Sequence, residues 1–213
     1  MRDVAIIGVG IHPFGRFPGK DFTEIGQVAV VDALKDAGIP WKEVQAAFCG
    51  NMTSGTAAGH RVLARVGQTG IPIVNVENAC ASGGSALRLA VQSVATGLYD
   101  VALAFGVEKM PRGFMAMTSY DRWQMLQGLG INPIGMALTA RWHMDTYGTT
   151  ALQLARVSVK SHKNGALNPN AMYRKPLSLE EIMNSPMVCD PLRLLMLCAP
   201  DEGAAAAITH LDR

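Results

Sequence analysis

Residues 71–84 read IPIVNVENACASGG, and this stretch decides how the chain around it folds. Its first part, Ile71 to Val76, is a short apolar run that is typical of a strand. From Ala81 to Ala95 most residues are small or apolar, and Gly97 follows shortly after, which predicts a helix. Because this helix is small or apolar on nearly every side, we expect it to be buried. Cys80 stands where the predicted strand meets the predicted helix.

Four more stretches have the continuous apolar character of buried strands, and they cover residues 4–9, 45–49, 101–106 and 203–209. A helix is predicted between the first two, because Asp21 and Glu24 have the spacing of a capping box. A shorter helix is expected over residues 60–66. Strands that alternate with helices predict an α/β fold with a largely parallel sheet.

The composition changes between residues 111 and 196, where Met, Pro, Gly and Trp are scattered and long strand-like runs are missing. A helix is predicted over 149–164, and Ser178 with Glu181 forms a second capping-box pattern that opens a short helix. This stretch of about 85 residues is too long for a plain loop. We therefore expect an insertion domain of helix and loop over 111–196, within an α/β domain formed by 1–110 and 197–213.

The composition excludes several classes of protein. Of the 213 residues, 49% are hydrophobic and 17% are charged, which excludes an intrinsically disordered chain. The net charge of +2 and the absence of a basic block argue against nucleic-acid binding. No apolar stretch is long enough to cross a membrane, and Met1 leads straight into the first predicted strand without a signal peptide. The four cysteines form no CxxC pair, so we expect no metal site and a reducing, cytoplasmic compartment.

Cys80 is the strongest candidate for chemistry. The start of a helix offers unpaired backbone N–H groups and the positive end of the helix dipole. Both favour the thiolate, which is the reactive form of a cysteine. Position alone leaves two interpretations open, a nucleophile or one more small buried side chain. Cys49, Cys189 and Cys198 lack this setting, and we expect them to be inert core thiols.

The run Asn78 to Gly83, NACASG, closely resembles the nucleophile motif of the thiolase family. The resemblance continues along the chain, in VAIIGVG at 4–10, GVEKM at 106–110 and CAPDEGAAAAI at 198–208. The pair His143-Met144, followed by YGTT, is similar to the insertion-domain signature of the sterol-carrier-protein-X branch of that family. The resemblance implies a thiolase-like N-terminal half, with a mixed, mostly parallel five-stranded sheet, flanking helices and a helical insertion domain.

The resemblance also implies an activity, namely acyl transfer between Cys80 and coenzyme A. This is thiolysis of a 3-oxoacyl-CoA, or its reverse, a Claisen condensation, with the acyl group held on Cys80 as a thioester. In the family the insertion domain helps to cover the pantetheine arm of the acyl-CoA, which implies a substrate-binding role for His143 and Met144. Coenzyme A and acyl-CoA are substrates here, and no cofactor is expected to stay bound.

Thiolases consist of two similar α/β halves, and the resemblance covers the first half with its insertion. We expect the C-terminal half, with its histidine loop and oxyanion donors, to be absent from these residues, so that the chain is incomplete as a catalyst. One alternative is a non-catalytic half, from a truncation or a split enzyme. A second is a retro-aldolase acting on an acyl-CoA side chain. A ketosynthase-like enzyme is a third, but the CASG run argues against it.

The resemblance implies partners as well. Thiolases dimerise around the strand that precedes the nucleophile, which implies a homodimer formed near Ile71 to Val76. A separate C-terminal thiolase half, or a small protein with a zinc ribbon and an OB-fold, is a further possible partner. Neither a nucleic acid nor a membrane is expected.

Overall fold

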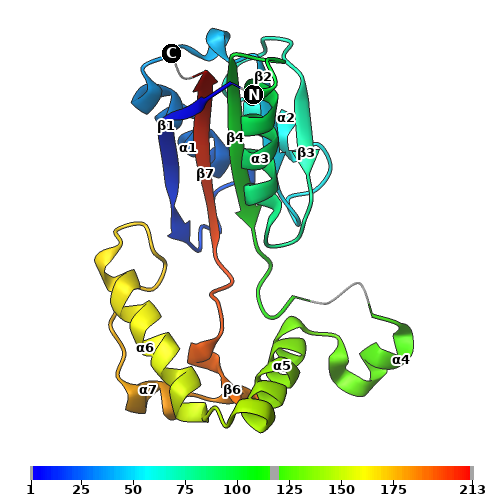
Figure 1. Cartoon of the computed structure of the whole chain (residues 1–213), viewed down its shortest axis with the longest axis vertical. Coiled ribbons are helices and arrows are strands. Elements are labelled where there is room, and N and C mark those ends of the chain that lie inside the picture. Colours follow the sequence, from blue (N-terminus) through cyan, green and yellow to red (C-terminus); the bar gives the residue numbers. More distant parts are fainter. Residues whose placement is uncertain (1, 116–119, 212–213) are drawn as a thin grey trace. The chain divides into compact units, whose positions relative to one another are not determined.

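The computed structural model describes residues 2–115 and 120–211 (Figure 1). The chain divides into two compact units. The first comprises Met1–Met110 with Asp201–Arg213, and the second comprises Pro111–Pro200. Each unit is described by itself.

The first unit is built on a five-stranded sheet with the order β1-β7-β4-β2-β3. Its strands are β1 (Val4–Gly15), β2 (Ala46–Gly50), β3 (Ile73–Val76), β4 (Val101–Lys109) and β7 (Glu202–Leu211). β2 pairs in parallel with β3 and β4, whereas β7 runs antiparallel to both β4 and β1. Four strands therefore point one way and only β7 points the other. The predicted α/β fold with a mixed, mostly parallel five-stranded sheet is confirmed.

The direction of β7 follows from where the second unit joins the sheet. The chain leaves β4 after Lys109 and returns at Glu202, and these two residues are paired across the strands. Departure and return thus lie at the same end of the sheet, so that the returning strand runs antiparallel to the one that left.

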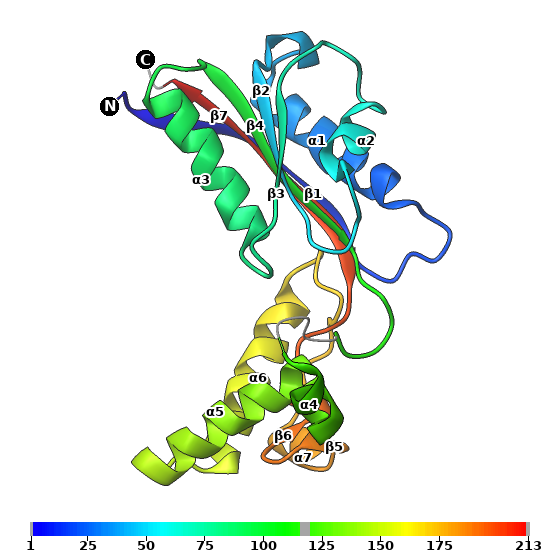
Figure 2. The same cartoon turned by 90° about the vertical axis from the view of Figure 1, so that its right-hand side faces the viewer.

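Helices cover both faces of this sheet (Figure 2). α1 (Phe22–Ala37) and α2 (Ala58–Leu63) lie on one face, and α3 (Ser82–Ala95) lies on the other. A single turn, η1 (Trp41–Glu43), precedes β2. The capping box predicted at Asp21 is present and opens α1. The helix predicted over 60–66 is found slightly earlier, as α2.

The core forms one cluster on each face. Against α1 and α2 it is built from larger side chains, including Ile25, Leu103 and Ile208, none of which is exposed. Against α3 it is built mainly from alanines, with Ala86 and Ala90 of the helix packed on the sheet. Small side chains on both surfaces let α3 approach the sheet closely.

The expectation that every strand is buried is wrong for the two edge strands. In β3, Val74 is 44% exposed, and in β1, Val9 is 60% exposed. β1 also continues past the strand predicted over 4–9, through Pro13 to Gly15. A proline has no N–H to donate and is tolerated at a sheet edge, and β1 pairs only with β7.

The expectation that α3 is buried on nearly every side is also wrong. Its sheet-facing side is buried, but Gly83, Arg88 and Gln92 on the opposite side are exposed. The amino-acid composition of a helix shows what it can bury, whereas its neighbours determine what it does bury.

The second unit is mainly helical, as predicted. Its elements are α4 (Arg122–Gln124), η2 (Met125–Leu129), α5 (Asn132–Tyr147), α6 (Ala151–Leu167), α7 (Leu179–Met183), β5 (Met187–Cys189), β6 (Leu192–Arg193) and η3 (Leu194–Met196). α6 occupies the helix predicted over 149–164, and Ser178 caps α7 as predicted.

One expectation for this unit is wrong, because β5 and β6 form a two-stranded sheet where only helix and loop were expected. The strands contain three and two residues, which is too short for a periodic pattern to appear in the sequence. Along residues 2–115 and 120–211, no helix is both long and apolar enough to cross a membrane.

A glycine in β1 tests how closely α1 packs on the sheet. A Cβ at Gly10 would overlap the carbonyl oxygen of Ala29 and the backbone nitrogen of Ala33. Backbone atoms of a helix cannot move as a flexible side chain can, so Gly10→Ala should lower the free energy of unfolding by about 1–3 kcal/mol. Urea denaturation measures this change. The matched control is Gly19→Ala, because a Cβ there meets nothing within 4 Å; equal effects at both positions would contradict the packing described.

Candidate active site

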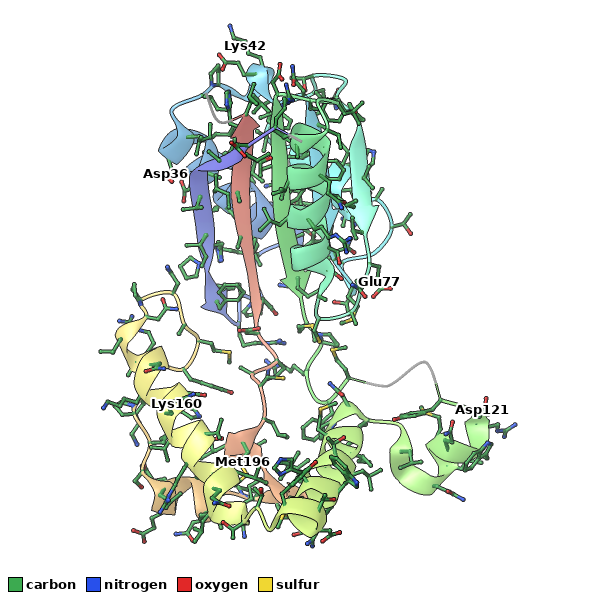
Figure 3. All side chains as sticks on the ribbon, viewed as in Figure 1. Asp36, Lys42, Glu77, Asp121, Lys160 and Met196 are labelled. Carbon is green, nitrogen blue, oxygen red and sulfur yellow. The ribbon has the colours of Figure 1, made fainter. Side chains whose placement is uncertain are left out.

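Cys80 lies in the five-residue connection between β3 and α3, and it is exposed. Figure 3 shows Glu77, the first residue of this connection, at the junction of the two elements. Ala79, directly before the cysteine, has a φ of 45°, one of two positive values at non-glycine residues in the described part of the chain. L-residues rarely adopt this left-handed conformation, so the chain bends sharply immediately before Cys80.

Hydrogen bonds of side chains with the backbone hold this bend. The hydroxyl of Ser82 accepts a bond from the N–H of Asn78 at 2.8 Å and donates one to the carbonyl of Ala79 at 2.7 Å. The N–H of Ala79 donates to a carboxylate oxygen of Glu77 at 2.6 Å. The amide of Asn78 donates to the hydroxyl of Ser85 at 3.0 Å. The residues around Cys80 thus form a locally bonded turn and not a loose loop.

Glycines let the start of α3 rest on the ends of the central strands. A Cβ at Gly50, the last residue of β2, would lie 2.5 Å from the carbonyl carbon of Ser82 and 2.7 Å from the nitrogen of Gly83. A Cβ at Gly106 of β4 would lie 3.8 Å from the Cα of Gly83. β2 and β4 therefore lie directly against the first turn of α3, next to the connection that carries Cys80.

Glu108 has a structural role in the neighbouring loop. Its carboxylate accepts hydrogen bonds from the backbone N–H groups of Met52 and Thr53, at 2.8 and 3.0 Å, and from the hydroxyl of Ser54 at 3.0 Å. These bonds tie the loop that follows β2 to the end of β4.

The other cysteines differ from one another in exposure. Cys49 is fully buried in β2, and burial, with a smaller contribution from the charge of Glu108, raises the pKa of its thiol to about 12. This thiol is protonated in the folded protein at neutral pH, and its predicted position in the core is confirmed. The expectation of a core position is wrong for Cys198, which is exposed, and for Cys189, which is half-buried. Cys189 ends β5, and Cys198 lies in the irregular segment between η3 and β7.

The two residues expected to bind substrate lie in α5 of the second unit, and Cys80 lies in the first. His143 is exposed; its Nδ1 is 2.8 Å from the hydroxyl of Thr149, and its ring centroid is 4.7 Å from that of Tyr147. Met144 is half-buried, and its carbonyl accepts the N–H of Gly148, which ends the helix in a left-handed conformation. These contacts orient the His143 ring near the end of α5. The hydrogen bond with Thr149 uses Nδ1 of the ring and not Nε2.

A pocket of about 470 Å³ opens beside the other end of β3. It does not include Cys80, and no sequence pattern predicts it, because its walls come from η1, α2, the segment 67–70 and the start of β3. Its lining residues are Trp41, His60, Arg61, Leu63, Ala64, Gly67, Gln68, Thr69, Gly70, Ile71 and Ile73.

The sequence reading also missed the residues that hold the turn, above all Ser82 and Glu77. A serine two positions after the cysteine, at the start of a helix, is a signal that side-chain bonding to the backbone is available.

In the part of the chain that the structure describes, no group of three or more His, Cys, Asp and Glu side chains is arranged to hold a metal ion.

The four thiols should react in an order that reflects these settings. A limiting dose of iodoacetamide near neutral pH should label Cys80 first, because it is exposed and lies two residues before Ser82, where α3 starts. Cys49 should be labelled only after denaturation. Peptide mapping by mass spectrometry measures the order, and Cys198 is the internal control, as an exposed thiol away from any helix start. Labelling of Cys198 before Cys80 would contradict this account.

Comparison with known proteins agrees with the fold. The family profile of the thiolase N-terminal domain matches residues 4–195. An acetyl-CoA acetyltransferase of Methanothermobacter thermautotrophicus is 41% identical, over 98% of this chain and 57% of that protein. Sterol carrier protein 2 of Bos taurus is 35% identical, over 96% of this chain and 41% of that protein.

Among solved structures, one titled as an Ltp2-ChsH2(DUF35) aldolase superposes with a TM-score of 0.81 at 27% identity, covering 97% of this chain and 55% of that one. The chain spans about half the length of the curated relatives it matches. The matched profile, the relatives and the shared fold together establish that the chain belongs to the thiolase family and corresponds to its N-terminal domain.

Proposed function

We propose that Cys80 is the nucleophile of a thiolase-type acyl transfer on acyl-CoA substrates, in a protein completed by a second thiolase half. The observation that carries this proposal is an exposed cysteine on a bonded strand-to-helix turn, within the run NACASG. A relative named acetyl-CoA acetyltransferase supports the reaction class.

The thiolate of Cys80 attacks the C3 carbonyl carbon of a 3-oxoacyl-CoA. The bond between C2 and C3 then breaks; its electron pair stays on C2, which takes up a proton, and acetyl-CoA leaves. The shortened acyl group remains on Cys80 as a thioester. The thiol of a second coenzyme A attacks this thioester, which releases the new acyl-CoA and the free cysteine. The Claisen condensation is the same sequence in reverse.

This chain supplies the nucleophile, but the reaction needs more groups. Among the described residues, no hydrogen bond or ion pair joins Cys80 to a histidine or to any charged side chain. A cysteine nucleophile needs a base, and each oriented oxyanion donor contributes about 2.7–4 kcal/mol to acyl transfer. We assign these groups to the second half, so the chain alone should be acylated very slowly.

The finer assignments belong to the same proposal. His143 and Met144 would lie along the pantetheine arm of the acyl-CoA, with coenzyme A as a substrate and not a resident cofactor. A partner subunit is part of the proposal, either a separate C-terminal half or a small zinc-ribbon and OB-fold protein. A solved structure whose title names two components supports the idea of a partner.

A retro-aldolase is the second candidate, and the aldolase title of that solved structure favours it. Such an enzyme cleaves a carbon–carbon bond without a covalent thioester. The two candidates therefore differ in whether Cys80 is needed for bond cleavage.

Replacement of the nucleophile tests the proposal. In a protein completed with a C-terminal half, Cys80→Ser should lower kcat for thiolysis of a 3-oxoacyl-CoA by about 1000-fold or more, because no thioester can form. Cys198→Ser, at another exposed thiol, should leave kcat unchanged. If Cys80→Ser keeps thiolysis, the nucleophile assignment is wrong; if it keeps cleavage of a 3-hydroxyacyl-CoA instead, the retro-aldolase is correct.

The edge of the sheet leads to a prediction about assembly. Within residues 2–115 and 120–211, β3 pairs only with β2, and Val74 and Asn75 on it are exposed. The other edge of β3 can therefore pair with a second copy. Sedimentation at micromolar concentration should therefore show a homodimer, and Val74→Lys should shift it to the monomer by placing a charge on that edge. A wild-type chain that sediments as a well-behaved monomer would contradict this assignment.

A further inference from the structure

We propose that Ser82 is a positioning residue for Cys80, and that it acts by holding Ala79 in the left-handed conformation. This inference rests on the proposed function, in which Cys80 is the nucleophile. It concerns the direction and reactivity of the thiol and assigns Ser82 no contact with substrate.

The first step is that Ala79 needs something to hold it. Its φ of 45° lies in a region that an L-residue with a Cβ rarely adopts. Its side chain is exposed, so packing does not impose this conformation. A strained residue persists only where its surroundings fix it, and such residues gather at functional sites.

The second step is that hydrogen bonds fix the backbone on both sides of Ala79. On the N-terminal side, the N–H of Asn78 donates to the Ser82 hydroxyl at 2.8 Å. On the C-terminal side, the carbonyl of Ala79 accepts from the same hydroxyl at 2.7 Å and from the backbone N–H of Ser82 at 3.1 Å. One hydroxyl thus connects the peptide group between Glu77 and Asn78 with the carbonyl of Ala79, and so spans the bend at Ala79.

The third step is that Ser82 is itself buried and closely packed. It is 5% exposed and stands in the first turn of α3, which rests on Gly50 without room for a Cβ. Glu77, which accepts the N–H of Ala79, is exposed, and water competes for its carboxylate. The buried hydroxyl of Ser82 is therefore the stronger of the two restraints.

The restraint on Ala79 also orients Cys80, because the two residues share a peptide group. Its preceding carbonyl, that of Ala79, is bound to Ser82, and the N–H of Ala81 after it donates to the carbonyl of Asn78 at 2.9 Å. With the peptide groups on both sides fixed, the Cα–Cβ bond of Cys80 has one direction. Loss of the Ser82 hydroxyl would let Ala79 relax to a negative φ and would turn the thiol away.

The experiment measures the rate of alkylation of Cys80 by iodoacetamide, peptide by peptide, between pH 6 and pH 10, and it needs no acyl-transfer activity. Ser82→Ala should lower the rate at pH 7 about tenfold and move the pH–rate profile to higher pH, because the thiol leaves the start of α3. The matched control is Ser93→Ala, since Ser93 is a buried serine of the same helix that also donates to a carbonyl. The control should leave the profile unchanged.

A rescue variant separates positioning from a general loss of structure. Glycine adopts positive φ without strain, so Ala79→Gly combined with Ser82→Ala should restore most of the rate that Ser82→Ala loses. Ala79→Val, at an exposed position, tests the inference independently if Ser82→Ala does not fold. Ala79→Val keeps every hydrogen-bonding group but strongly disfavours positive φ, and it should reproduce the slow rate in a folded protein.

Three results would overturn the inference: a rate in Ser82→Ala equal to that of Ser93→Ala, no rescue in the double variant, or a wild-type rate in Ala79→Val. Failure of the proposed function is a separate result. It would appear as thiolysis that survives Cys80→Ser, whatever the alkylation rates show.

Discussion

The close contact between the start of α3 and the end of β2 is the constraint on which the site depends. Gly50 is the place where they meet, and any side chain there would push the first turn of the helix off the sheet. The contact fixes Ser82, whose hydroxyl fixes the bend at Ala79, and the bend presents Cys80 at the surface. The alanine-rich packing of α3 on the sheet extends the same close approach along the helix. The thiol of Cys80 is thus exposed, whereas Ser82, which supports the bend, is buried.

Much of the fold could be predicted from the sequence because the strands are continuous apolar runs that end in turns. All five strands, the helix opened by Asp21 and the insertion between β4 and β7 follow from such local signals. The predictions that were wrong concerned features that are not determined by local sequence. Val74 and Val9 are exposed because β3 and β1 are edge strands. The order of the strands in the sheet cannot be deduced from the local sequence of each strand. The strands β5 and β6 are too short to show the alternating pattern by which a strand is recognised in a sequence.

The candidate site shows the same division between local and tertiary information. The position of Cys80 between strand and helix is local, and the sequence predicted it. The bend at Ala79 and the two bonds of Ser82 depend on backbone geometry that no residue pattern states. The exposure of Cys198 and the pocket beside β3 depend on how distant segments pack, so neither was predicted. A sequence therefore identifies the candidate nucleophile more readily than the residues that hold it.

The central claim is that Cys80 carries an acyl group, and trapping that group tests it most directly. A protein completed with a C-terminal half is mixed with a 3-oxoacyl-CoA in the absence of free coenzyme A, quenched in acid and digested, and its cysteine peptides are weighed by mass spectrometry. The account predicts that the peptide containing Cys80 gains the mass of the shortened acyl group, while the peptides of Cys49, Cys189 and Cys198 do not. An acyl group on another residue, or turnover with no acylated peptide, would contradict it.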